Sequence, residues 1–98
     1  MNVRVIPVNF TVDQKLVDFI EQRLEKLAAI YDQIVGVEVY LRVENVSDRI
    51  NKLVEMNLSV PGNNLVVKKQ CKSFEEATDQ CIDALRRQVV KKKEKVRP

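Results

Sequence analysis

The chain has 98 residues, of which 45% are hydrophobic and 32% charged, and its formal net charge is +3. This length fits one small globular domain, which we expect to span residues 1–98. No apolar run approaches the ~20 residues that cross a bilayer, and residues 1–10 (MNVRVIPVNF) are too interrupted by polar residues for a secretory signal. We therefore expect a cytoplasmic protein with no membrane partner.

The first half of the chain predicts a strand, a helix and a second strand. Residues 2–5 alternate, with Val3 and Val5 on one face. Asp13 is expected to cap a helix that runs to about Asp32. Its apolar residues follow helical spacing: Leu16, Phe19, Ile20, Leu24, Leu27 and Tyr31. Residues 37–44 (VEVYLRVE) give the clearest strand, whose inward face is expected to carry Val37, Val39, Leu41 and Val43.

The second half predicts two more strands and a final helix. Residues 54–60 alternate in the same way, and the turn sequence PGNN at 61–64 leads to a strand from Leu65. Lys69 falls on the inward face of that strand, so we expect this face to reach solvent near there. Ser73 and Glu76 form a capping box that opens the final helix. The apolar stripe of this helix consists of Phe74, Ala77, Cys81, Leu85 and Val89.

The element order is therefore β-α-β-β-β-α, and each strand has one apolar and one polar face. Both helices must then cover the same side of the sheet. The first β-α-β unit is a crossover connection, which makes the first two strands parallel and the remaining pairs antiparallel. We predict an α+β fold with a single four-stranded mixed sheet and both helices packed on one face.

Residues suited to catalysis or metal binding are scarce. The chain has no histidine, two glycines and two cysteines, Cys71 and Cys81, which lie in no CxxC motif. We interpret both cysteines as small apolar core residues. The sequence predicts no enzyme activity, no metal site and no cofactor.

The positive charge is concentrated at the end of the chain. Seven of the 17 basic residues and one of the 14 acidic residues fall in 86–97, which gives this segment a net charge of +6 and leaves −3 for the rest. The helix dipole favours bases only in the last turn, so it explains one or two of them. The apolar stripe stops at Val89, and we expect residues ~90–98 to project past the sheet or to fray. A polyanionic partner is favoured over a merely solvated terminus.

The first helix also separates its basic residues from its acidic residues. At 100° per residue, Lys15, Gln22 and Lys26 share one flank, with Arg23 at the border of the apolar stripe, and the acids lie on the other flank.

The exposed sheet face offers only Tyr40 for base stacking, so phosphate contacts from the helices to a folded RNA are favoured, and no DNA partner is expected. Two alternatives remain: a generic structured-RNA-binding module, and a protein-interaction module that uses the exposed sheet face.

Three segments carry a resemblance to a known family. They are RLEKLAAIYDQI in the first helix, VEVYLRVENV in the second strand and ALRRQVVKKKEK in the last helix. In this order and at these distances, the chain resembles the ribosome hibernation promoting factors, also called ribosome-associated inhibitors or sigma-factor modulation proteins. The family motif D-x-Y-x-A-I-D at the start of the last helix reads SFEEATD here, so Ser73 and Glu75 depart from it. Because the chain ends at Pro98 without the additional dimerisation domain of long members, we expect a short form.

The resemblance implies a function and a set of site residues. Family members bind the small ribosomal subunit in the mRNA and tRNA channel near the decoding region, and they block translation under stress or in stationary phase. The family's basic positions fall on Arg23, Lys26, Arg87, Gln88, Lys91, Lys93 and Lys95, to which the neighbouring bases add Arg86 and Lys92. We therefore expect ribosomal RNA to be bound by these residues, and the free protein to be a monomer.

Overall fold

The computed structural model describes residues 1–44 and 49–96, except for the side chains of 93–96. Its elements are β1 (Asn2–Pro7), α1 (Gln14–Ile30), β2 (Gly36–Val43), β3 (Lys52–Val60), β4 (Asn63–Cys71) and α2 (Phe74–Val96). This order confirms the predicted β-α-β-β-β-α arrangement. Within the described ranges, no helix is long and apolar enough to cross a membrane.

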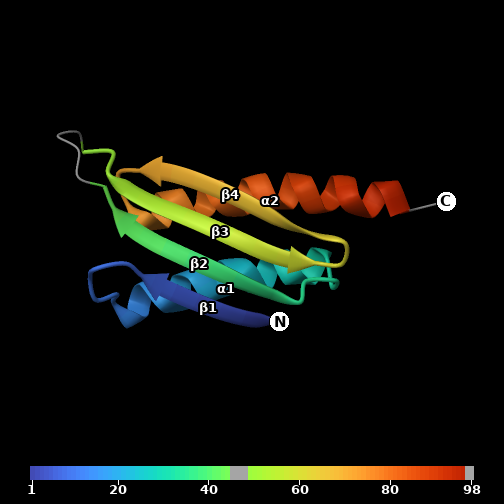
Figure 1. Ribbon diagram of the computed structural model, residues 1–98, viewed down its shortest axis with the longest axis horizontal. Coiled ribbons are helices and arrows are strands. Elements are labelled where there is room, and N and C mark those ends of the chain that lie inside the picture. The colour runs from blue at the N-terminus through green and yellow to red at the C-terminus, as the bar shows by residue number, and fades with distance from the viewer. Residues whose placement is uncertain (45–48, 97–98) are drawn as a thin grey trace.

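The four strands form one mixed sheet in the order β1-β2-β3-β4. β1 pairs with β2 in parallel, while β2–β3 and β3–β4 are antiparallel, as predicted. In Figure 1 the sheet lies in front of both helices, so α1 and α2 cover the same face. The two helices also begin at the same end of the sheet and run in the same direction, which brings their C-terminal halves to one end of the molecule (Figure 1).

The core lies between this sheet face and the two helices. Val39, Met56 and Leu58 of the sheet and Leu24 and Leu85 of the helices are 0% exposed. The alternating strand residues therefore supply one side of the core, and the helical stripes supply the other. The single-sided pattern in the sequence is confirmed.

One detail of the predicted strand faces is wrong, and a second holds in part. Val43, which was expected inward, is 50% exposed because it lies at the end of β2. Lys69 is half-buried, and Cys71, the next inward residue of β4, is only 5% exposed. The inward face of β4 therefore reaches solvent in part at Lys69, as predicted, but it is covered again at Cys71. Alternation fixes which face a residue occupies, but not how far the helices extend over it.

Both helices begin at side-chain caps that the sequence predicted. Asp13 Oδ1 accepts a hydrogen bond of 2.8 Å from the backbone N–H of Lys15. Ser73 Oγ accepts one of 3.1 Å from the backbone N–H of Glu76. These bonds satisfy donors that the first turn of a helix leaves without partners, and they fix where each helix starts.

Candidate nucleic-acid interface

The basic residues of α2 extend from a segment of the helix that is anchored in the core. Cys81 and Leu85 are 0% exposed and Val89 is 1% exposed. The helix continues without a break to Val96, and Figure 1 shows its last part reaching beyond the turn between β3 and β4. The prediction that residues ~90–98 project or fray stays a prediction for the last residues, since 97 and 98 lie outside the described part.

The structure divides the predicted α2 site residues into two groups. Arg86, Arg87 and Lys91 are exposed, and none of them forms an ion pair or hydrogen bond with another described residue. Gln88 and Lys92 are half-buried because they follow the buried Cys81 and Leu85 by seven positions, two helical turns, and so lie on the core side of α2. The side chains of the two remaining predicted residues, Lys93 and Lys95, lie outside the described residues.

Lys92 lies against the sheet rather than facing outward. A Cβ atom placed on Gly62 would be 4.0 Å from Lys92 Nζ, so the ammonium group lies over the turn that joins β3 to β4. Gly62 has a φ of 95°, a left-handed conformation that glycine adopts readily. Lys92 therefore belongs to the contact between α2 and the sheet, and it is less available to an external partner than its charged neighbours.

Arg23 of α1 lies at the seam between the helices. Its Nε donates a hydrogen bond of 2.8 Å to Asp79 Oδ1 of α2. Its guanidinium carbon is 4.4 Å from the centroid of the Phe19 ring, within cation–π range. Sequence reasoning placed Arg23 at the border of the apolar stripe but missed Asp79, because a pattern within one helix does not reveal its partner on another.

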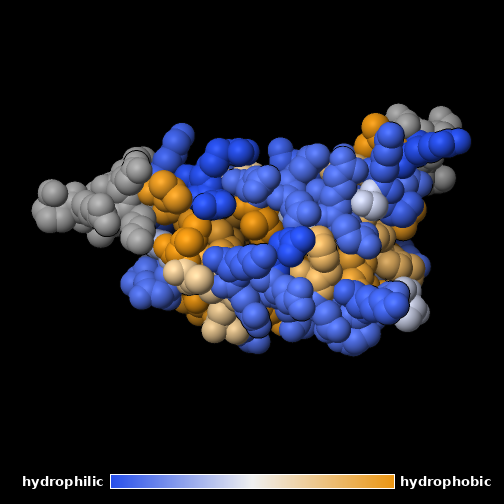
Figure 2. Space-filling model, turned by 180° about the vertical axis from the view of Figure 1, so that it is seen from behind, coloured by the Kyte–Doolittle hydropathy of each residue, from blue (hydrophilic) through white to orange (hydrophobic). Residues whose placement is uncertain are grey.

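Basic residues of both helices reach solvent on the helix side of the molecule. Arg86 follows Asp79 by seven residues, two helical turns, and so lies on the same side of α2, toward α1. Lys26 is exposed on α1 one turn beyond Arg23 in the same direction. Lys91 follows Arg86 by five residues, so it lies about 140° further around α2, away from the seam with α1. We call the set Arg23, Lys26, Arg86, Arg87 and Lys91 the basic helix surface. Figure 2 shows the helix side from behind, with hydrophilic side chains over most of it and apolar side chains visible between them.

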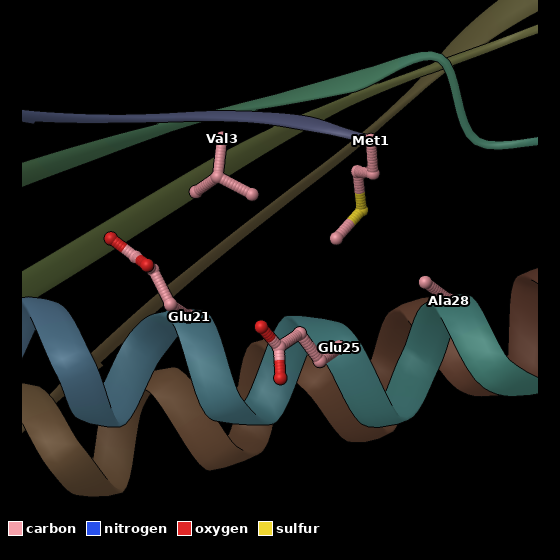
Figure 3. Close-up of a pocket in the computed structure, with 5 residues that line it drawn as sticks. All are labelled: Met1, Val3, Glu21, Glu25 and Ala28. Carbon is pink, nitrogen blue, oxygen red and sulfur yellow. The ribbon is translucent and has the colours of Figure 1, made fainter.

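The acidic flank of α1 faces away from this surface. Figure 3 shows Glu21 pointing from α1 toward β1 and Glu25 lying along α1 one turn further on; with Met1, Val3 and Ala28 they line a hollow of about 410 Å³ between α1 and the start of the chain. The predicted separation of charges on α1 is therefore confirmed. Glu21 and Glu25 lie on the β1 side, and Arg23 lies on the α2 side, where Asp79 of α2 is its acidic neighbour.

The open face of the sheet has a different character. Arg4 and Glu38, on neighbouring strands, form an ion pair of 3.6 Å. Tyr40 lies opposite Glu55 on β3 and is half-buried. This face mixes both signs of charge and carries no set of exposed aromatic rings among the described residues. A stacking platform for single-stranded bases is therefore a poor fit, and the helix side is the better candidate for a polyanion.

The cysteines contribute nothing to this surface. Both are buried and neither forms a disulfide. Cys81 Sγ donates to the Val54 carbonyl at 3.4 Å, and burial raises the pKa of this thiol to about 12. Burial also raises the pKa of Cys71. Among residues 1–44 and 49–96, no group of three potential metal-binding side chains occurs.

The fold and the basic helices correspond to a known class of protein. Residues 3–97 match the family described as Sigma 54 modulation protein / S30EA ribosomal protein, and the chain belongs to this family. The resemblance predicted from the sequence is thereby confirmed.

Named relatives are similar in sequence to this chain over nearly its full length. The ribosome hibernation promoting factor of Pseudomonas putida is 30% identical over 95 residues, which cover 97% of this chain and 89% of the relative. That of Klebsiella oxytoca is 28% identical over 97 residues, which cover 99% and 98% of the two chains.

Two solved structures share the fold. A ribosomal subunit interface protein from Coxiella burnetii gives a TM-score of 0.84 at 17% identity, covering 96% of this chain and 99% of that one. The Thermus thermophilus Protein Y N-terminal domain gives 0.77 at 23% identity, with 91% and 96% covered. At these identities, the likeness is evidence for the fold alone.

Proposed function

We propose that this chain is a ribosome hibernation factor that binds the small ribosomal subunit through ribosomal RNA. The observation that carries the proposal is the set of exposed cations Arg86, Arg87 and Lys91 on a helix that is anchored by buried residues. Cations on a fixed backbone suit a rigid array of phosphates, and folded RNA provides such an array. The family membership and the names of the relatives support the same role.

The binding site that we propose is the mRNA and tRNA channel near the decoding region. A body of 50 × 24 × 19 Å could occupy a cleft while its basic helix surface contacts the RNA wall. Occupancy of the channel would exclude mRNA and tRNA and so block translation under stress or in stationary phase. The role is one of binding by a single domain and a monomer, with no catalytic step, and it places the protein where ribosomes are, in the cytoplasm.

Co-sedimentation with purified small subunits at several salt concentrations tests the proposal. If about five cations reach phosphates, the slope of log K against log salt should be roughly −3.5 to −4.5. Equal binding to a free RNA duplex would favour the generic RNA-binding alternative. Binding that does not change with salt would favour a protein-interaction module that uses the sheet face, and would refute the proposal.

The position on the subunit needs a separate measurement. Chemical footprinting of the small-subunit RNA should show protection in the decoding region when the protein is bound. Bound mRNA with tRNA in the P site should compete with the protein. Protection confined to another part of the subunit, with no competition from mRNA, would contradict the proposed channel site.

A further inference from the structure

Arg23 is held by two contacts from different helices. Asp79 of α2 accepts from its Nε at 2.8 Å, and Phe19 of α1 lies under its guanidinium at 4.4 Å. The Arg23 side chain is 32% exposed, and that of Asp79 is 50% exposed. The arginine is therefore restrained, while part of its guanidinium remains open to solvent.

Most of the hydrogen-bonding capacity of this guanidinium is unused. An arginine has five N–H donors, and only the Nε donor has an acceptor among the described residues. The four N–H groups on Nη1 and Nη2 remain available. These two nitrogens form a planar fork that matches a pair of phosphate oxygens. Because the carboxylate occupies the Nε position, it leaves this fork free.

We propose that Asp79 is a positioning residue that holds Arg23 ready to bind a phosphodiester group of RNA with its two terminal nitrogens. The inference rests on the proposed function, because it assigns a phosphate as the ligand of the helix seam. A free arginine side chain loses rotamer freedom when it binds an anion. Here the ion pair with Asp79 and the contact with Phe19 restrict that freedom before the RNA arrives, so binding costs less entropy.

A purely structural role for Asp79 predicts the opposite result. A half-exposed ion pair stabilises a fold only slightly. Asp79 also places a negative charge beside the basic helix surface, so by electrostatics alone its removal should tighten the binding of a polyanion. A positioning role predicts weaker binding when the same charge is removed. The sign of the change therefore separates the two interpretations.

The test compares Asp79→Asn with a matched control, Asp83→Asn. Asp83 is exposed one turn further along α2, and no described residue forms an ion pair or hydrogen bond with it. Both substitutions remove one negative charge and preserve side-chain shape. In co-sedimentation with small subunits, we expect Asp79→Asn to weaken binding about fivefold, because the amide keeps an acceptor oxygen for Arg23 Nε but loses the charge that strengthens this hydrogen bond. We expect Asp83→Asn to bind as tightly as the wild type or more tightly.

A double-substitution cycle shows whether Asp79 acts through Arg23. Arg23→Gln should weaken binding, and adding Asp79→Asn to it should cause no further weakening. Circular dichroism and thermal unfolding establish that each variant is folded, and Asp79→Glu, which keeps the charge, should retain most of the affinity.

Three outcomes would overturn the inference. If the wild type binds but Asp79→Asn binds equally well or better, the inference alone fails. It also fails alone if Asp79→Asn weakens binding equally with and without Arg23. If the wild type itself does not pellet with small subunits, the proposed function fails and the inference fails with it.

Discussion

Replacing Arg87 and Lys91 together with alanine tests the role of α2 most directly. The two residues are four positions apart, so they lie one turn apart on the same side of the helix. Both are exposed and neither has a partner among the described residues. Alanine favours helix and removes no buried atoms here, so we expect the melting temperature to change little.

The expected loss of affinity follows from the two missing phosphate contacts. If each contributes about 1 kcal/mol or more, by analogy with hydrogen bonds to charged groups, two contribute about 2 kcal/mol. This corresponds to roughly thirtyfold weaker binding to small subunits, since ~1.4 kcal/mol is tenfold. The slope of log K against log salt should also become shallower by about 1.4 to 1.8, because each lost phosphate contact removes ~0.7 to 0.9.

The matched control removes two positive charges elsewhere. Lys68 is exposed on β4, and Lys72 is exposed between β4 and the start of α2. Replacing both with alanine lowers the net charge by the same amount as the Arg87 and Lys91 replacement. The control variant therefore shares any long-range electrostatic effect, but it should lose no phosphate contact. Pelleting assays on both double variants, with circular dichroism for folding, give the comparison. If the Arg87 and Lys91 variant pellets like the wild type, or if both variants weaken equally, α2 is not the binding element.

Three further predictions concern the fold. Leu24→Ala should lower the free energy of unfolding by ~2–5 kcal/mol in urea titrations because Leu24 is 0% exposed, whereas Glu25→Ala at an exposed neighbour should have little effect. Gly62→Ala should cost about 1–2 kcal/mol in the same measurement because its φ is 95°; an unchanged midpoint would show that the turn can adopt another conformation. Stability should fall as the pH rises above about 9, where the unfolded thiol of Cys81 ionises but the folded thiol, with its pKa raised to about 12, stays neutral. Cys81→Ala should reduce this pH dependence, and an identical pH profile in the variant would refute the assignment.

The fold could be predicted because its main determinants are local patterns. Val39 and Met56 alternate with polar residues, which fixes one buried face, and the spacing of Leu24 and Leu85 within their helices fixes the stripes that cover it. How far the two helices extend over the sheet depends on their packing in three dimensions, so the exposure of Val43 could not be predicted from alternation.

The candidate site was predictable in composition but not in arrangement. The excess of charge identified α2 and the residues from Arg86 onward. It could not show that Lys92 turns toward Gly62, because that depends on where the β3–β4 turn lies relative to the helix. Nor could it show that Asp79 pairs with Arg23, because the two residues come together only when the helices pack in the same direction.

The continuity of α2 has a consequence for the energetics of any complex. Arg86 and Lys91 belong to the same helix as the buried Leu85 and Val89, so folding of the core already orders their backbone. A flexible basic tail would have to lose on the order of 1–2 kcal/mol of backbone entropy per residue when it binds. An isolated peptide of residues 86–98 should therefore bind RNA far more weakly than the whole domain does. The proposed binding is thereby coupled to folding, and a substitution that loosens the core beneath α2 should weaken it without changing any residue that contacts the partner.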